Sequence, residues 1–212
     1  MAQINKRLWN SGSTRFGFFL LLLIIGTTGL MAQGLQSADL QTFNLERNSL
    51  NGKAMTVLGS WAILNMAVNT PLMLREGENS TRYFYQMNAA WNVINVAIAG
   101  FGYYGSINPE VGLSLYQSLQ EQAAIERILL FNAGLDVGYM ATGLWMMEKS
   151  KTHEKHAHRL KGYGQSLILQ GGFLFVFDLI VYGLQRQNNT LAEQLLSHLS
   201  LGPGGPGLVI HF

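Results

Sequence analysis

Long apolar stretches separated by short polar loops dominate the pattern of this chain. Four of the stretches are about 20 residues long, which is the helix length needed to cross a hydrocarbon core of roughly 30 Å. Aromatic residues gather at several of their ends, as they do where membrane helices meet the interface. The pattern predicts an all-α fold, an antiparallel four-helix transmembrane bundle with spans at residues 55–74, 83–105, 127–147 and 163–185.

The N-terminal segment, residues 1–33, has the layout of a signal peptide. Three basic residues precede or border an apolar run at residues 16–25, which is short for a membrane span. Small residues follow, and Ala32 fits the position before a cleavage site. We therefore expect residues 34–212 to form one membrane domain. The alternative is that the segment is retained as a fifth helix.

A soluble four-helix bundle is the competing interpretation of the same pattern. A helix that faces water needs a polar outer surface, usually one that carries Lys and Glu. In residues 128–147 the ionisable side chains are Asp136 and Tyr139, and residues 163–185 contain a single carboxylate, Asp178. These segments lack a charged face, so the pattern favours lipid as their surroundings.

Short amphipathic surface helices are expected outside the spans. Asp39 is a suitable N-cap, and the Asn-Pro-Glu sequence at residues 108–110 is typical of a helix start, with Pro at the first helical position. Leucines at helical spacing near the C-terminus predict a further helix lying in the interface, followed by a Gly- and Pro-rich tail. The expected surface helices are residues 38–51, 111–126 and 190–201.

Basic residues are distributed unevenly among the loops, and this predicts the orientation. If the signal is cleaved, the new N-terminus lies outside and the loops at 75–82 and 148–162 lie inside. These two loops carry most of the Lys and Arg of the membrane domain, whereas the outer loop at 106–126 carries none. Positive charge is enriched on the cytoplasmic side. We therefore expect a multi-pass protein of the cytoplasmic (inner) membrane with both termini on the outer, periplasmic side.

Composition narrows the possible function classes. The net charge is +2 and no basic patch is interleaved with aromatic residues, so no nucleic-acid partner is expected. The absence of Cys excludes disulfides, thiolate chemistry and iron–sulfur ligation. All five His residues lie outside the spans, which argues against haem, and those at 153–158 are interpreted as part of a solvated basic loop. No cofactor and no metal are predicted.

Polar side chains recur inside the predicted spans. The spacing Trp-x-x-x-Asn occurs twice, at residues 61–65 and 91–95, and the fourth span carries Gln170. A helical rise of about 1.5 Å per residue places one set of polar residues roughly 10 to 15 Å below the outer ends of the spans. This set, to which all four spans contribute, is the candidate intramembrane polar site: Asn65, Asn95, Asn132, Asp136 and Asp178.

The two Asp residues are the costliest members of this set. An Asp near mid-membrane costs roughly 2.5–3.5 kcal/mol on insertion scales, whereas an interhelical hydrogen bond returns about 0.6 kcal/mol on average. We predict that Asp136 and Asp178 face the bundle centre and that at least one is protonated. Beside them, Gly134-x-x-x-Gly138 is typical of a helix-packing face.

Three blocks of sequence carry a family resemblance. They read YFYQMNAAWNVINVAIAGFGYYG at residues 83–105, ILLFNAGLDVGYMATGLWMMEK at 128–149 and RLKGYGQSLILQGGFLFVFDLIVYGL at 159–184. Together with the Gly-rich end that closes on Phe, they resemble a family of small bacterial multi-pass membrane proteins whose domain has no assigned function. The resemblance extends over residues 40–212 and implies a compact membrane domain with a signal sequence. It implies no activity, cofactor or catalytic residue.

These observations lead to three hypotheses on function. The first is a non-enzymatic assembly or scaffold component, with the lipid bilayer and other membrane proteins as partners. The alternative is a small transporter or proton-coupled channel that uses Asp136 and Asp178, and the third is an intramembrane enzyme with both carboxyls in hydrogen-bond reach across a cleft. A water-filled cavity that reaches the Asp residues would favour transport. A dry packed core with a large apolar outer surface would favour assembly.

Overall fold

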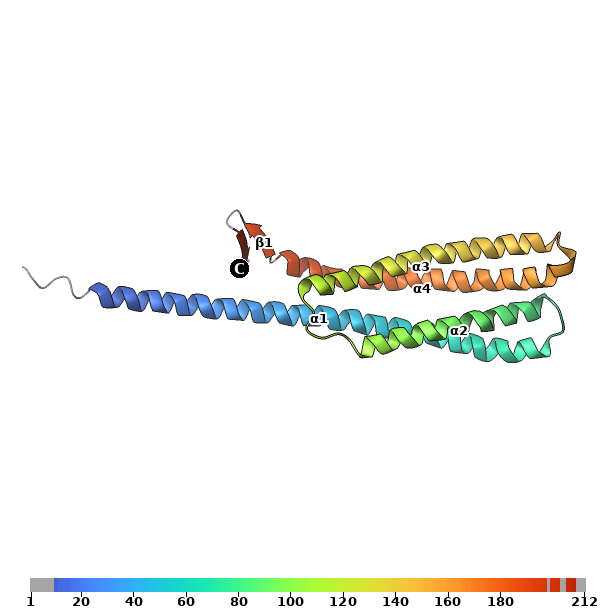
Figure 1. Cartoon of the computed structure of the whole chain (residues 1–212), viewed down its shortest axis with the longest axis horizontal. Helices are drawn as coiled ribbons and strands as arrows, with labels where there is room; N and C mark the ends of the chain where they lie inside the picture. Colours follow the sequence, from blue (N-terminus) through green and yellow to red (C-terminus); the bar gives the residue numbers. More distant parts are fainter. Residues whose placement is uncertain (1–9, 198, 203–204, 209–212) are drawn as a thin grey trace, which may run out of the picture.

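Four long helices make up most of the computed structural model, which describes residues 10–197, 199–202 and 205–208 (Figure 1). The positions of side chains are described for residues 38–189. The helices are α1 (Asn10–Arg75), α2 (Ser80–Ile107), α3 (Leu115–Ser150) and α4 (Ala157–Ser197), with a short 3-10 turn, η1 (Glu154–His156), ahead of α4. Each predicted span lies inside one helix, so the all-α class is confirmed for the body of the protein.

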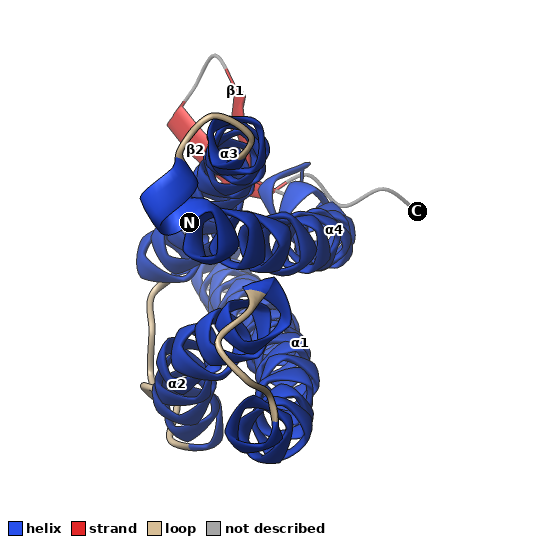
Figure 2. Cartoon of the chain, turned by 90° about the vertical axis from the view of Figure 1, so that its right-hand side faces the viewer, coloured by secondary structure: helices blue, strands red, loops and turns tan. Residues whose placement is uncertain are grey.

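The helices form two antiparallel hairpins, α1 with α2 and α3 with α4. The side chain of Asn79, the N-cap of α2, accepts a hydrogen bond from the backbone N–H of Arg82 at 2.9 Å and so begins the second helix. α4 packs against both helices of the other hairpin, whereas α2 and α3 are not among the described helix pairs that pack together (Figure 2). The two hairpins are therefore joined mainly through α4.

Close approach within the α3–α4 hairpin depends on two facing glycines. A Cβ added to Gly143 would lie 2.6 Å from the carbonyl oxygen of Gly164, and a Cβ added to Gly164 would lie 2.6 Å from the carbonyl oxygen of Gly143. Only Gly fits at both positions, because its missing Cβ allows the two backbones to touch.

The predicted packing face at Gly134 and Gly138 is not part of this contact. Both glycines are exposed, and a Cβ added at either would meet no described atom within 4 Å. With 3.6 residues per turn, Gly143 is rotated by about 140° to 180° around the helix axis from these two residues. The prediction therefore chose the wrong face of α3 for packing within the chain.

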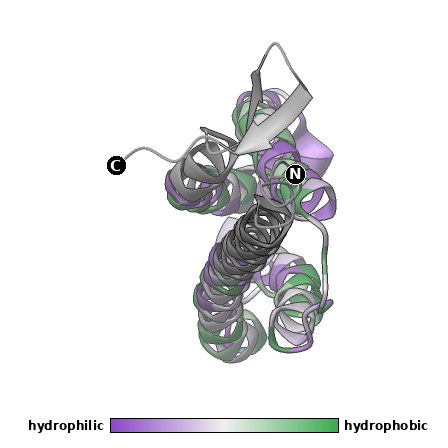
Figure 3. Cartoon of the chain, turned by 90° about the vertical axis from the view of Figure 1, so that its left-hand side faces the viewer, coloured by the Kyte–Doolittle hydropathy of each residue, from purple (hydrophilic) through white to green (hydrophobic). Residues whose placement is uncertain are grey.

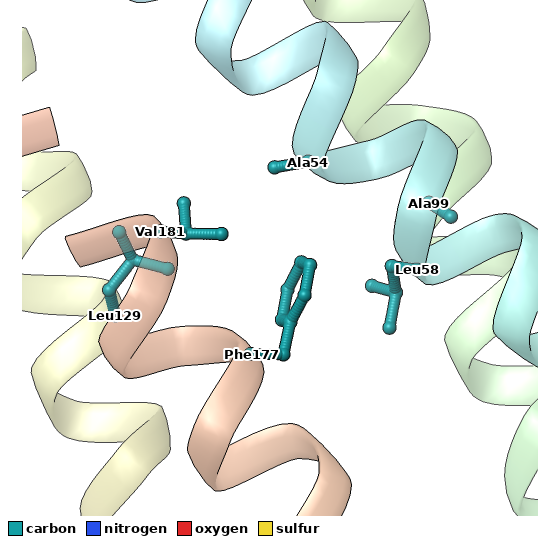
Figure 4. Packing of buried hydrophobic residues seen from close by; sticks show 6 residues of the cluster. All are labelled: Ala54, Leu58, Ala99, Leu129, Phe177 and Val181. Atoms are coloured by element: carbon teal, nitrogen blue, oxygen red, sulfur yellow. The ribbon is translucent and has the colours of Figure 1, made fainter. Parts of the chain in front are cut away.

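A small apolar cluster joins the two hairpins (Figure 4). Phe177 is its largest member and points from α4 toward α1. All four helices contribute to the cluster, which consists of Ala54, Leu58, Ala99, Leu129, Phe177 and Val181. Alanine at two of these positions keeps the helices close together. The apolar core is therefore a limited patch around Phe177.

Much of the remaining interior is polar, while the outer surface is largely apolar. The side chains of Asn88, Asn92 and Gln170 have no exposed surface. By contrast, Phe101 is 81% exposed and Phe131 is 68% exposed, and many other large apolar side chains are exposed as well. Apolar residues recur along the helices (Figure 3). Soluble monomers rarely expose apolar surface on this scale. Polar side chains are thus common inside the bundle and apolar side chains common outside it, which is the inverse of a water-soluble bundle.

Two helical stretches in the described part of the chain are long and apolar enough to cross a membrane, Ala38–Arg75 and Glu154–Asn189. The core helix of a soluble protein or a signal sequence can meet the same criterion. The intervening helices, α2 and α3, do not meet it, since Asn, Gln and Glu lower their average hydropathy. The two stretches suggest membrane association and do not establish four spans.

The predicted short surface helices are not separate elements. Residues 38–51 continue without a break into the first predicted span as part of α1. Asn108, expected to begin a helix, instead ends α2, and its side-chain amide donates a hydrogen bond to the carbonyl oxygen of Tyr104 at 3.0 Å. The next helix begins only after Ser114, which forms a capping box with Gln117. The helix therefore starts at the Ser-x-x-Gln capping box and not at the Asn-Pro-Glu sequence.

Both ends of the chain also differ from the expectations. α4 runs to Ser197 and is followed by two short antiparallel strands, β1 (Leu199–Gly202) and β2 (Gly205–Leu208), where a separate helix and a tail were expected. At the other end, residues 10–33 are helical and continuous with the rest of α1, which extends well beyond the other helices (Figure 1). The basic residues before position 10 lie outside the described residues, and signal cleavage stays a prediction.

Candidate functional site

Gln170 joins three helices inside the bundle. Its side-chain oxygen accepts a hydrogen bond from Trp61 Nε1 at 3.1 Å. Its amide nitrogen donates to Asn65 Oδ1 at 3.3 Å and to Asn88 Oδ1 at 2.6 Å. The Trp61 ring also stacks on Phe173, with ring centroids 3.8 Å apart. Both donors and the acceptor of the buried Gln170 amide are used, so this Gln170 junction of Gln170, Trp61, Asn65 and Asn88 is held by matched polar groups.

Five asparagines of α1 and α2 use their amide nitrogens within their own helices. Nδ2 of each of four residues donates to the carbonyl oxygen one turn earlier, at 2.7–3.1 Å: Asn65, Asn69, Asn88 and Asn92. Asn95 differs, because its Nδ2 donates to Asn92 Oδ1 at 3.2 Å. This arrangement leaves Oδ1 of Asn65 and Asn88 free to accept from α4. The side chains of Asn65 and Asn88 therefore offer hydrogen-bond acceptors to α4, and the amide nitrogen of Gln170 lies between them and donates to both.

A second polar network closes the bundle at the end where α2 leads into α3. Gln122 Nε2 donates to the carbonyl oxygen of Gln185 at 2.8 Å, and Gln185 Nε2 donates to Asn51 Oδ1 at 2.8 Å. Both glutamines are almost completely buried. The network connects α1, α3 and α4 through side-chain amides.

Arg47 extends this network and is itself 1% exposed. It donates to the carbonyl oxygen of Ser118 at 3.0 Å and forms an ion pair with Glu121. Burial lowers the pKa of Arg47, while the Glu121 carboxylate acts in the opposite direction. The neighbouring Glu121 carboxylate favours the charged form of the guanidinium. The ion pair ties α1 to the start of α3.

A cavity of about 450 Å³ lies among the four helices and reaches Asp136 and Asp178. Asp136 of α3 is 2% exposed and Asp178 of α4 is 6% exposed. Asn95 and Asn132 line the same cavity. We refer to this space as the acidic cavity. It combines two buried carboxyls and two amides, and it is the candidate functional site.

The two carboxyls of the acidic cavity are close enough to interact with each other electrostatically. Oδ2 of Asp136 is buried without a hydrogen-bond donor, and no Lys, Arg or His in the described part of the chain forms an ion pair with either carboxyl. Two neighbouring carboxylates in an apolar environment cannot both be ionised without a countercharge. The pair therefore requires a proton or another cation.

A glycine on α4 allows the two Asp residues to come together. A Cβ added to Gly171 would lie 2.9 Å from the backbone carbonyl oxygen of Asp136 and 3.0 Å from Cγ of Met140. The backbone of α3 at Asp136 thus rests directly on α4, two turns of helix from Asp178. Together with the Gly143–Gly164 contact, this packing sets the spacing of the acidic pair.

Aromatic and aliphatic side chains form most of the cavity wall. Trp91 and Tyr139 meet edge to face with ring centroids 4.8 Å apart, and Phe177 lies on the α4 side. Aromatic faces attract organic cations, and a space of a few hundred Å³ is typical of small-molecule sites. The arrangement can hold a proton or a compact cation with apolar substituents. No group of three or more His, Asp or Glu residues that could hold a metal ion occurs among the described residues.

The structure divides the predicted polar site into two. Asn95, Asn132, Asp136 and Asp178 line the acidic cavity. Asn65 belongs instead to the Gln170 junction. Gln170 and Asp178 are eight residues apart on α4, which corresponds to about 12 Å along the helix. Gln170 is adjacent to Gly171, which contacts the backbone of Asp136, so the two groups lie side by side and overlap in depth. The role of their members in binding stays a prediction.

Sequence reasoning missed the central position of Gln170 and the aromatic wall. The signal for Gln170 is that it is a lone amide within an apolar run of α4. The signal for Trp91 is the repeated Trp-x-x-x-Asn spacing, since one copy, Trp61 with Asn65, lies in the junction and the other, Trp91 with Asn95, lines the cavity. The Gln122–Gln185 network could not be predicted from the pattern of any single span, because it consists of contacts between helices.

Comparison with known proteins identifies a family but no function. Residues 57–179 match a family of unknown function (DUF6992). The match covers more than half of the chain, and the protein therefore belongs to this family. It includes the Gln170 junction and both Asp residues of the acidic cavity. No curated protein and no solved structure matches the chain.

Proposed function

We propose that this member of the family is a four-span protein of the cytoplasmic membrane. The inverted distribution of side chains supports the proposal, because buried amides pair with each other while exposed Phe, Leu and Trp contact acyl chains. The basic loops at 75–82 and 148–162 then lie in the cytoplasm, and both termini lie in the periplasm.

The chain contains no Cys, so single cysteines can test this topology cleanly. In intact cells a membrane-impermeant maleimide should label Glu110→Cys in the outer loop. It should label Thr152→Cys in the inner loop only after the cells are permeabilised. Equal labelling of both variants in intact cells, or a protein that stays in aqueous solution without detergent, would contradict the proposal.

Within this membrane protein, we propose that the acidic cavity makes the chain a small proton-coupled transporter of an organic cation. One observation carries the proposal: a cavity of about 450 Å³ reaches a buried carboxyl pair that has no described basic partner and in which Asp136 Oδ2 has no hydrogen-bond donor. The wall of Trp91, Tyr139 and Phe177 suits a cation with apolar or aromatic substituents.

Charge balance suggests how such a site would work. In the empty state a proton shared by Asp136 and Asp178 offsets their negative charge. When a monovalent cation enters, it takes over this role and the proton leaves to water, so the net charge of the cavity is unchanged. Because proton and cation compete for one pair of carboxyls, a proton gradient can drive exchange of the two.

The experiment uses purified protein in liposomes with an acidic interior and an alkaline exterior. Ethidium, an aromatic monovalent cation, serves as the probe, and its uptake is followed by fluorescence. We expect uptake by the wild-type protein that collapses when an ionophore dissipates the proton gradient. Asp178→Asn and Asp136→Asn should reduce uptake to the level of protein-free liposomes.

The matched control is Glu148→Gln. It also removes one carboxylate, but Glu148 is exposed, pairs with Lys151 and lies outside the cavity. This variant should retain wild-type uptake. Uptake that survives in both Asp variants, or that is lost equally in Glu148→Gln, would refute a role of the acidic pair.

Two neighbouring carboxyls are also compatible with acid–base catalysis. The cavity wall argues for binding instead, because beyond the two carboxyls its polar side-chain groups are those of Asn51, Asn95, Asn132, Trp91 and Tyr139. We therefore place the enzyme hypothesis behind transport. Hydrolysis of membrane-embedded peptides by the wild-type protein, but not by Asp136→Asn, would reverse this order.

An assembly or scaffold role is the second candidate, and a different surface supports it. Gly134 and Gly138 are exposed on α3 next to Phe131, which is 68% exposed. A small-residue face of this kind allows a helix of another membrane protein to approach closely. Gly138→Cys should then form a crosslink to a partner, which mass spectrometry can identify, whereas Gly183→Cys on α4 should not.

A further inference from the structure

An apolar groove of about 500 Å³ runs between α1 and α4. Phe177 and Val181 separate it from the acidic cavity, since they line both spaces. Val57 and Val176 are among its other walls and are 54% and 55% exposed. Lys53 is the single charged residue that lines it. The groove therefore offers a long apolar surface with one positive charge.

A polar recess continues the groove. The two spaces share Leu50, Lys53 and Leu184. The recess is further lined by the polar residues Glu46, Ser49, Gln187 and Asn188. No carboxylate in the described part of the chain forms an ion pair with Lys53. The apolar groove thus opens into a polar recess in which the ammonium group of Lys53 is available to bind an anion.

The level of this recess agrees with the water–hydrocarbon boundary. Lys53 lies two residues before the first predicted span, and Gln187 lies two residues after the fourth. Two helices that run in opposite directions therefore place the recess at the same depth. Lipid headgroups lie at this depth, and basic side chains near the boundary attract anionic headgroups.

We propose that this groove is a binding site for an anionic phospholipid. One acyl chain lies along Val57, Phe173 and Val176, and the phosphate accepts hydrogen bonds from Lys53 and the hydroxyl of Ser49. Glu46 repels the phosphate from one side of the recess and so directs it toward Lys53. The inference rests on the proposed membrane location and is independent of transport.

The test measures lipid retention by native mass spectrometry of the full-length protein in detergent. The probes are phosphatidylglycerol and phosphatidylcholine with identical dioleoyl chains. We expect the wild-type protein to retain phosphatidylglycerol at least about tenfold better, which corresponds to about 1.4 kcal/mol. Lys53→Gln should abolish this preference, and Val57→Trp, which fills the groove, should reduce the retention of both lipids.

Lys149→Gln is the matched control. Lys149 is exposed in the last turn of α3 and lines neither the groove nor the recess, so this variant should leave the lipid preference unchanged. Equal retention of both lipids by the wild-type protein, or an undiminished preference in Lys53→Gln, would overturn the lipid site. A dimer that Val57→Trp dissociates would assign the groove to a second copy of the chain and also overturn it. A protein that needs no detergent would instead contradict the membrane location.

Discussion

The Gln170 junction and the acidic cavity are built from similar residues but differ in whether their buried polar groups have hydrogen-bond partners. Each contains one Trp-x-x-x-Asn pair, Trp61 with Asn65 in the junction and Trp91 with Asn95 in the cavity. In the junction, Gln170 supplies both donors and an acceptor, so that three helices share a matched network. In the cavity, two carboxyls meet with a buried oxygen that lacks a donor.

This difference separates two uses of polar groups in an apolar solvent. A matched interhelical hydrogen bond contributes about 0.6 kcal/mol on average to a membrane protein. A buried Asp costs roughly 2.5–3.5 kcal/mol on insertion scales. Matched amides are therefore a reasonable way to hold helices together, whereas the acidic pair lowers stability. We infer that the junction is structural and that the pair serves binding.

The most damaging change should be one that separates α3 from α4. Gly143→Val places a Cβ against the Gly164 carbonyl oxygen and against Ile168, and we expect the free energy of unfolding to fall by about 3 kcal/mol. Reversible unfolding in mixed detergent and dodecyl sulfate micelles measures this loss. Cation uptake should fall as well, since the contact holds Asp136 beside Asp178.

Gly138→Val is the control for this variant, because it introduces the same side chain on the same helix at an exposed position. Its free energy of unfolding should change by less than about 0.5 kcal/mol. Equal destabilisation by both substitutions would mean that valine is unfavourable anywhere on α3, and the close-contact explanation would be wrong.

A smaller loss is expected when the junction is broken. Gln170→Leu keeps the volume but removes three hydrogen bonds, those with Trp61, Asn65 and Asn88, and should lower the free energy of unfolding by about 2 kcal/mol. Residual folded protein should still bind ethidium, as measured by fluorescence titration. Gln86→Leu, at an exposed glutamine, should have little effect. A stable Gln170→Leu protein that no longer binds the cation would reverse the roles of the two regions.

The smallest effect should come from neutralising the acidic pair. In Asp178→Asn the new amide can donate to Asp136, so the free energy of unfolding should stay unchanged or rise by about 0.6 kcal/mol. The same unfolding assay measures it. A fall of 2 kcal/mol or more, on the scale of about three lost hydrogen bonds, would show that the pair is structural.

The helices and the candidate residues of the cavity were predictable because their signals are local. Apolar length placed one helix over each predicted span, and depth estimated from the helical rise grouped four residues that line one cavity, Asn95, Asn132, Asp136 and Asp178. The high cost of Asp in an apolar segment also identified the two residues that turned out to be neighbours.

The remaining features depend on packing between helices, which spacing along one helix does not determine. Gly134 and Gly143 are both small residues on α3, yet only the rotation of the helix decides that Gly143 faces Gly164. Similarly, depth along the spans grouped Asn65 with the acidic pair, whereas Asn65 Oδ1 accepts from Gln170 and Asn65 does not line the cavity. The rotation of each helix about its axis was the missing information.

Proton release on cation binding tests the central claim most directly. Wild-type protein in weakly buffered detergent solution near neutral pH is titrated with ethidium, and a pH indicator reports the protons released. We expect about one proton to be released for each cation that binds, because the acidic pair holds one counter-charge at a time. In Asp178→Asn we expect neither binding nor release. Binding by the wild-type protein without proton release, or unchanged release in Asp178→Asn, would contradict the claim.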